Sequence, residues 1–478
     1  MATVSQQNID KNYEKIIVNL SKEDYLPEVE KAIKKLSKTA NIQGFRKGMV
    51  PLGHIKKLYG QSVFADEVLK TADSQLSKHL LDTKVEILAR PLPAENQNNI
   101  QFDINNPQDF TFEFEIGLKP KFEIPLFQSK KTTPLYKVNI TDEMLNEATE
   151  DMQYRVGEMK PVEQISDEND VINFDLIFSN EEKNIKRSFL LKYFTPETQN
   201  LLKGKKEKDN VSIKLDNAFN DEFKNQILKD LNASDLINQD VTFHIEKIEH
   251  IEKAELNKDF FEKIFPGLEI DTEEKFKEKL KTEISNQWDK EVRTHLHNEL
   301  FETLVHETTI DLPHTFLKRW LSIGGDKFKP MEQVEKEYSG FEHQIRWQLI
   351  SDKIIDENKI EVKKDEMETA AKMQVINYFN QYGQAPSIEE EWVDDFAKKQ
   401  LADKKFSNQL YERILTDKVF FTIENSINLQ ETEISKDEFI KLVQEQQAHH
   451  HHHHTHDHDH HHHDHDHSHD HEHHHHNH

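Results

Sequence analysis

A single apolar residue recurs at every fourth position from Phe276 to Leu304. The stripe consists of Phe276, Leu280, Ile284, Trp288, Val292, Leu296, Leu300 and Leu304. This spacing is typical of an α-helix, and four residues turn a helix by roughly 400°, so the stripe shifts around the helix by roughly 40° at each step. Such a stripe cannot face one core along its whole length. It predicts a long helical arm that packs against different neighbours, with Asp271 or Thr272 as its cap.

Other local patterns divide the rest of the chain into domains. Tyr13–Leu20 is strand-like, and apolar residues alternate strictly over Phe110–Leu118, which predicts a half-buried strand. Ser21 lies three residues before Asp24, a spacing typical of a helix start. We therefore predict a multidomain α+β protein. Its expected parts are an α+β N-terminal domain over 1–120, a connector with a helix capped by Thr141 over 121–157, a small β-rich domain over 158–252, an all-helical domain over 253–448, and a tail over 449–478.

Composition excludes several classes of function. The 478 residues include no cysteine, which rules out disulfides, thiolate metal sites and cysteine nucleophiles. No apolar run is long enough to span a membrane, and the first residues lack the pattern of a signal peptide, so we expect a cytoplasmic protein with no membrane partner. The net charge of −27 argues against DNA binding or broad contact with nucleic acid. No GxxxxGK[ST] pattern occurs, which favours an activity without ATP.

The segment "NIQGFRKGMVP", from Asn41 to Pro51, combines glycine, an aromatic residue and bare cations. Gly44 and Gly48 flank Phe45, Arg46 and Lys47. Because glycine relaxes backbone limits, we expect a tight tip between the helix that starts near Ser21 and a short helix that opens at Pro51. A longer helix is expected over 62–88. Phe45 cannot easily reach its own core there, and the local positive charge would attract RNA or an acidic protein surface. The alternative is a solvated hairpin without a function, which the composition alone favours.

"GFRKGMVP" resembles the ribosome-docking motif of trigger factors, bacterial chaperones that meet nascent chains at the exit tunnel. The segments "IKKLYGQSVFADEVL", "FEFEIGLKPKFEI", "IDLPHTFLKRWL" and "FIKLVQEQQA" also resemble that family, so the similarity covers roughly residues 1–448. It implies an extended helical domain with arms, no required cofactor, and an ability to form homodimers. It also implies that a large-subunit ribosomal protein and nearby rRNA contact a site made of Gly44, Phe45, Arg46, Lys47 and Gly48.

The resemblance further implies that scattered apolar side chains of the helical domain bind unfolded nascent polypeptides. Aromatic and methionine side chains suit changing partners because they are large or adaptable. For each one, burial between helices is the alternative. The candidates are Phe316, Trp320, Phe328, Met331, Trp347, Met367, Met373, Tyr378, Phe379, Tyr382, Trp392 and Phe396.

The middle domain departs from the pattern that the family implies. Trigger factors carry a domain similar to FKBP-type prolyl isomerases, whose aromatic pocket holds the X–Pro bond. Here Gly204 is the only glycine from Glu158 to Pro266, and "SNEEKNIKRS" (Ser179–Ser188) replaces a glycine-containing turn. We therefore expect a degenerate domain with weak or lost isomerase activity. Its candidate peptide pocket consists of Phe174, Phe178, Phe189, Tyr193 and Phe194, with an ordinary core as the favoured alternative.

Histidine dominates the end of the chain. Of the last 30 residues, 21 are His, interleaved with Asp, which favours a native segment over a purification tag. Neutral imidazoles and carboxylates bind Zn²⁺ or Ni²⁺, and a tail without apolar residues cannot fold alone. Some FKBP-type isomerases have comparable tails. We expect a disordered metal-binding tail whose candidate ligands include His449, His450, His451, His456, His458, His460, His465, His467 and His469.

Three functions follow from these patterns. The first is a ribosome-associated, ATP-independent chaperone that binds nascent polypeptides and assists folding. The second is an active peptidyl-prolyl cis-trans isomerase with a metal-handling His tail. The third is a holdase or assembly factor independent of the ribosome, which would be indifferent to the loss of Phe45, Arg46 and Lys47.

Overall fold

The computed structural model describes most of the chain, namely residues 2–43, 45–46, 48–95, 100–178, 184–230, 240–325, 327–380 and 386–453. The chain forms two compact units. The first unit comprises Met1–Leu135, Thr294–Glu431 and Glu445–His478, and the second comprises Tyr136–Arg293 and Thr432–Gln444. Within the described residues, no helix is both long enough and apolar enough to cross a membrane.

The first unit begins with a four-stranded antiparallel sheet in the order β1-β2-β4-β3. Its strands are β1 (Thr3–Asp10), β2 (Tyr13–Leu20), β3 (Leu92–Pro93) and β4 (Phe110–Gly117). Ile16 pairs with Phe114, and the alternating apolar residues of β2 and β4 are buried against two helices. The strands at Tyr13 and Phe110 were predicted, whereas β1 was missed because six of its eight residues are polar.

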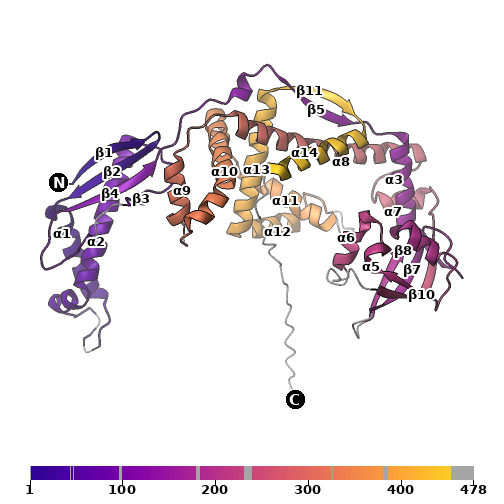
Figure 1. The fold of residues 1–478 in the computed structure, drawn as a ribbon, viewed down its shortest axis with the longest axis horizontal. Helices are drawn as coiled ribbons and strands as arrows, with labels where there is room; N and C mark the ends of the chain where they lie inside the picture. The colour runs from indigo at the N-terminus through magenta and orange to yellow at the C-terminus, as the bar shows by residue number, and fades with distance from the viewer. Residues whose placement is uncertain are drawn as a thin grey trace, which may run out of the picture. The chain divides into compact units, whose positions relative to one another are not determined.

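Helices α1 (Lys22–Thr39) and α2 (Leu52–Thr83) pack against each other and cover this sheet (Figure 1). The predicted start of α1 is confirmed, since the Ser21 backbone N–H donates to Asp24 Oδ2 at 2.8 Å. The prediction of two helices after Pro51 is wrong, because α2 continues through Gly60. A Cβ at Gly60 would lie 3.0 Å from Ile104, so this glycine permits close packing and does not interrupt the helix.

The rest of the first unit is a helical domain. Its parts are the second half of α8 (Glu273–Glu307), then α9 (His314–Ile323), α10 (Met331–Asn358), α11 (Lys364–Asn380), α12 (Glu391–Leu401) and α13 (Lys404–Ser426), with the short 3-10 helix η1 (Pro125–Gln128). One core joins α8, α9, α10 and α13, and a smaller core joins α11, α12 and α13. Strands β5 (Thr132–Val138) and β11 (Asn428–Ile434) pair with each other.

The second unit contains a five-stranded sheet in the order β6-β10-β7-β8, with β9 paired to the free part of β10. Its elements are α3 (Asp142–Arg155), β6 (Glu158–Pro161), β7 (Asp170–Phe178), β8 (Asn184–Leu190), η2 (Leu191–Tyr193), α4 (Pro196–Leu202), β9 (Asn210–Lys214), α5 (Leu215–Ala218), α6 (Asp221–Asp230), β10 (Asp240–Glu252) and α7 (Lys258–Ile264). The part of α14 (Lys436–His453) before Glu445 also belongs to this unit. Thr141 caps α3 as predicted, accepting from the Met144 N–H at 3.2 Å.

The apolar stripe of α8 behaves as its spacing predicted. Phe276 and Leu280 are buried with Phe260 and Phe261 in a core of the second unit. Leu296, Leu300 and Leu304 are buried in the main core of the helical domain. Thr272, one of the two expected caps, accepts from the Lys275 N–H at 3.3 Å. One helix thus contributes to two cores.

Candidate functional site

The segment between α1 and α2 is anchored at its end and turns tightly in its middle. Val50 and Ile55 are buried in the N-terminal core. The Phe45 N–H donates to the Ile42 carbonyl at 3.0 Å, which tightens the chain before Gly48. Gly48 has φ +80°, and a Cβ there would lie 3.3 Å from the Lys38 carbonyl oxygen. Glycine therefore suits this position for both its backbone conformation and the available space.

Apolar side chains face water at this tip. Phe45 is 36% exposed, and its ring rests against the His54 ring with centroids 4.9 Å apart. Met49 is 72% exposed and Leu52 is also exposed. The segment therefore presents apolar surface that no described residue covers.

Exposed cations are close to these apolar groups in the sequence. Arg46 is exposed. Lys35 and Lys38 near the end of α1 and Lys56 and Lys57 near the start of α2 are also exposed. Among the described residues, no carboxylate oxygen lies within 4.0 Å of the charged nitrogens of Arg46, Lys35, Lys38, Lys56 or Lys57. Lys31, by contrast, pairs with Glu28 at 3.1 Å. Gly44 and Lys47, which the sequence also assigned to this site, lie outside the described residues.

Three models of known protein families match successive parts of the chain. A family described as "Bacterial trigger factor protein (TF)" matches residues 2–152. "Probable trigger factor, FKBP-like domain" matches residues 159–253, and "Probable trigger factor, C-terminal domain" matches residues 271–443.

The chain belongs to the trigger factor family.

Curated relatives agree with this assignment. The trigger factor of Corynebacterium jeikeium is 24% identical over 400 residues, covering 78% of this chain and 72% of the relative. That of Prosthecochloris aestuarii is 21% identical over 453 residues, covering 89% and 96%, and that of Hamiltonella defensa is 23% identical over 445 residues, covering 87% and 94%. A solved structure titled "Promiscuous Substrate Recognition in Folding and Assembly Activities of the Trigger Factor Chaperone" has 18% identity and a TM-score of 0.49, covering 89% of this chain and 100% of its own.

Trigger factors are ribosome-associated chaperones, so the leading function predicted from the sequence is confirmed at the level of the family. The family implies interactions with the ribosome and with nascent chains. The alternative of a prolyl isomerase with a metal-handling tail is not favoured. The multidomain α+β fold with an FKBP-like domain and a helical C-terminal domain is also confirmed.

In the FKBP-like domain of this trigger factor, four of the five predicted pocket aromatics lie in the core. Phe174, Phe178, Phe189 and Phe194 are each at most 7% exposed. Phe194 stacks on Phe219 with ring centroids 4.8 Å apart. Tyr193 is half-buried, and its ring lies 4.5 Å from that of Phe223. The structure therefore brings the phenylalanines together as core residues and leaves Tyr193 partly accessible.

The helical domain exposes part of its predicted substrate-binding set. Phe316 is fully buried, whereas Phe328 and Met331 are exposed. Four aromatic rings gather on α11 and α12, where the rings of Tyr378, Trp392 and Phe396 lie within 6.4 Å of that of Phe379. Tyr378, Trp392 and Phe396 are each 40–54% exposed. We call these four residues the aromatic patch. Tyr382 lies outside the described residues.

The histidine tail lies almost wholly outside the described part of the chain. Helix α14 continues to His453, so the backbone at His449, His450 and His451 is helical and the helix ends later than the predicted boundary at Ala448. Their side chains are not described, and His456, His458, His460, His465, His467 and His469 lie outside the described residues.

A different group of potential metal ligands escaped the sequence predictions. Glu302, His306 and His343 each place one ligand atom within 4.8 Å of the others. The four-residue spacing of Glu302 and His306 on a predicted helix was a usable signal. Nothing in the local sequence linked them to His343, which comes from a later helix.

Proposed function

We propose that this trigger factor works without ATP at the exit tunnel of the ribosome. Gly44, Phe45, Arg46, Lys47 and Gly48 form the tip that binds a large-subunit protein and nearby rRNA. The helical domain binds unfolded segments of nascent polypeptides and releases them to fold. The observation that carries this proposal is that exposed Phe45 is next to Arg46, which has no carboxylate partner among the described residues, on a loop shaped by Gly48.

The chemistry of the tip suits a surface that is partly protein and partly RNA. Burying the exposed parts of Phe45 and Met49 would contribute about 25 cal/mol per Å² of apolar area removed from water. Arg46 and the exposed Lys35, Lys38, Lys56 and Lys57 would add an attraction to phosphate that weakens as salt screens it. A protein of net charge −27 needs such a local cationic surface to approach RNA.

The aromatic patch suits transient binding of unfolded chains. Its rings offer large apolar contacts on an open surface, and Trp392 lies beside exposed polar residues such as Glu391. Such surfaces bind many apolar segments weakly because no closed pocket selects one of them. Weak binding also lets a client leave and fold.

We further propose that the FKBP-like domain is degenerate. Burial of Phe174, Phe178 and Phe194 leaves little aromatic surface for an X–Pro peptide, so residual peptide contact is assigned to Tyr193 and Phe223. Turnover of a proline peptide near the uncatalysed rate is the expected result. Rates far above background that fall in Tyr193→Ala would refute degeneracy.

The roles proposed for the other parts of the chain are those that the sequence predicted. We propose ribosome binding by residues 1–120, a connector over 121–157, the degenerate domain over 158–252, substrate binding over 253–448, and Zn²⁺ or Ni²⁺ binding by the His residues of 449–478. We also propose a cytoplasmic location and a homodimer away from the ribosome. Exposed apolar side chains on the helical domain supply surface for that dimer.

Co-sedimentation with bacterial ribosomes across a salt series tests the proposed function. Phe45→Ala/Arg46→Ala removes one apolar and one cationic side chain from the tip. Leu81→Ala/Lys78→Ala removes the same two kinds of group from exposed positions near the other end of α2, and serves as the matched control. Wild type and control should pellet with ribosomes and weaken with salt, and the tip variant should stay in the supernatant. Equal pelleting of all three proteins would refute the proposed docking site.

A further inference from the structure

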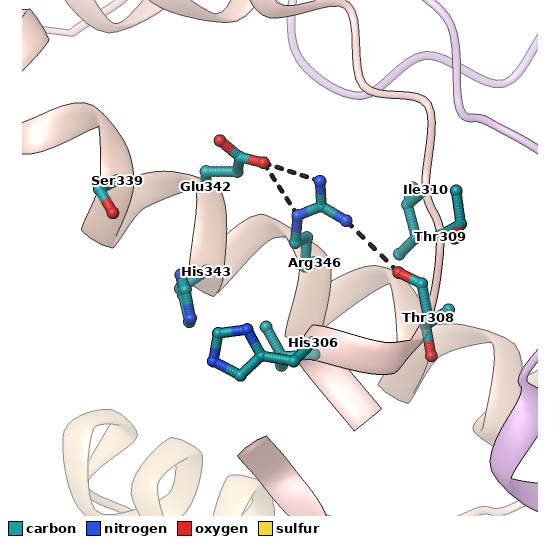
Figure 2. Close-up of a pocket in the computed structure, with 9 residues that line it drawn as sticks. His306, Thr308, Thr309, Ile310, Ser339, Glu342, His343 and Arg346 are labelled. Carbon is teal, nitrogen blue, oxygen red and sulfur yellow. Dashed lines mark hydrogen bonds and ion pairs between the residues drawn. The ribbon is translucent and has the colours of Figure 1, made fainter. Parts of the chain in front are cut away.

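Two helices of the helical domain bring together three side chains that commonly bind transition metals. Glu302 and His306 lie one turn apart on α8, and His343 lies on α10. His306 Nε2 lies 3.2 Å from Glu302 Oε2, and the ring centroids of His306 and His343 are 5.1 Å apart. Figure 2 shows the His306 ring next to His343 across the space between the two helices.

We propose that Glu302, His306 and His343 bind one divalent transition-metal ion of the zinc class. Two imidazoles and a carboxylate are suitable ligands for Zn²⁺ and Co²⁺. Tetrahedral bonds of about 2.0–2.1 Å place ligand atoms ~3.3 Å apart, close to the His306–Glu302 distance. The remaining ligand distances are at most 4.8 Å. The His306 side chain is 63% exposed, so its ring can rotate and shorten these distances to the other ligands.

The surroundings of the three ligands leave room for the ion and for water. His306 and His343 border a cavity of about 380 Å³ that is also lined by Ser339, Glu342 and Arg346. Arg346 would repel a cation, but its guanidinium donates to Glu342 Oε1 from Nε at 2.9 Å and from Nη2 at 2.8 Å (Figure 2). Arg346 Nη1 also donates to the Thr308 carbonyl at 3.4 Å. The guanidinium charge is therefore neutralised locally, and water can fill the fourth coordination position from the cavity.

A metal ion at this site would connect two helices of the helical domain. Its ligands are held on two packed helices, so a bound ion would link α8 to α10 inside the helical domain. An ion that binds the folded state alone stabilises it by mass action.

Removing the tail isolates the site for measurement. All buried residues in the described part of the chain lie at or before Phe439, so a chain ending at Ala448 keeps every described core and should fold. Titration of this shortened chain with Co²⁺ should give visible d–d absorption that saturates at one ion per chain. His306→Ala and His343→Ala should each weaken the affinity at least tenfold. His244→Ala, which removes a half-buried histidine from β10 in the second unit, should have no effect.

A second measurement uses the full chain. Zn²⁺ should raise the midpoint of thermal unfolding of the wild type by more than that of His306→Gln, a change at an exposed side chain that the fold should tolerate. The absence of d–d bands in the shortened wild type would overturn the proposal. Unchanged Co²⁺ affinity in both alanine variants, with circular dichroism showing intact helices, would also overturn it.

Discussion

Arg319 on α9 donates to the carboxylate of Glu115 on β4, and water hardly reaches this ion pair. The side chains are 13% and 9% exposed. The Tyr13 hydroxyl donates to the same carboxylate, and burial together with Glu115 raises the pKa of Tyr13 above its ordinary range. This network joins the N-terminal sheet to the helical domain, so the proposed docking domain and the proposed substrate-binding domain share a buried polar contact.

Arg319→Ala should destabilise the first unit strongly. Removing one partner of a buried ion pair leaves the other charge without compensation, which typically costs about 3–5 kcal/mol. The drop should appear as a lower midpoint in thermal unfolding of the full chain. Lys318→Ala is the control, because its pair with Glu335 is more exposed, at 30% and 55%, and should contribute less than about 1 kcal/mol. Equal shifts for the two variants would contradict the buried role of Arg319.

Gly117→Ala should also loosen this contact between domains. A Cβ at Gly117 would lie 2.5 Å from the Phe316 ring, which is fully buried, and overpacking of this kind costs about 1–3 kcal/mol. Gly53→Ala is the opposite case, since among the described residues no atom outside its chain neighbours and the backbone of α2 lies within 4 Å of its Cβ position. That change should stabilise the protein by about 0.5–1 kcal/mol. Urea unfolding of both variants tests the prediction, which fails if Gly117→Ala is as stable as wild type.

His295 should make the first unit sensitive to mild acid. Burial lowers the pKa of His295, although the nearby Glu299 carboxylate opposes the shift. Below about pH 6.5 the unfolded chain takes up a proton at this position more readily than the folded chain, so the free energy of unfolding falls. His295→Gln should flatten the dependence of the urea midpoint between pH 7.5 and 5.5. Identical slopes in the wild type and in His295→Gln would contradict this role.

The aromatic patch should carry much of the binding to unfolded proteins. Tyr378→Ala/Trp392→Ala/Phe396→Ala removes three exposed rings, so a higher chaperone concentration should be needed to prevent aggregation of a denatured client. Light scattering during dilution of the client from denaturant measures this, without ATP. Phe421→Ala is the control, because Phe421 is 64% exposed on α13 and outside the patch. Full protection by the triple variant would show that clients bind elsewhere.

Local sequence patterns predicted much of the fold because their signals lie within a few residues. The Ser21–Asp24 box, the Thr141 cap and the apolar stripe of α8 all have the predicted structure. The continuity of α2 through Gly60 was missed because it depends on packing against Ile104, which is distant in sequence. Strand β8 was missed for a similar reason, since its polar residues gain their partner only by pairing with β7.

The sites show the same division between local and long-range information. The tip could be predicted because Phe45, Arg46 and Gly48 are neighbours in sequence. The burial of the middle-domain phenylalanines agrees with the ordinary core that the sequence favoured, although the alternation along β7 does not say which second layer covers Phe174. The grouping of His306 with His343 depends on how α8 meets α10, and no local pattern encodes that contact.

The docking claim is tested most directly by a photo-activated cross-linker. An amino acid carrying the cross-linker would replace Phe45 at the tip or, as a control, Leu81 near the other end of α2, where the side chain is 77% exposed. After illumination with bacterial ribosomes, position 45 should cross-link to a protein of the large subunit, and position 81 should not. The absence of a cross-link at position 45, or equal cross-linking from both positions, would contradict ribosome docking through this loop.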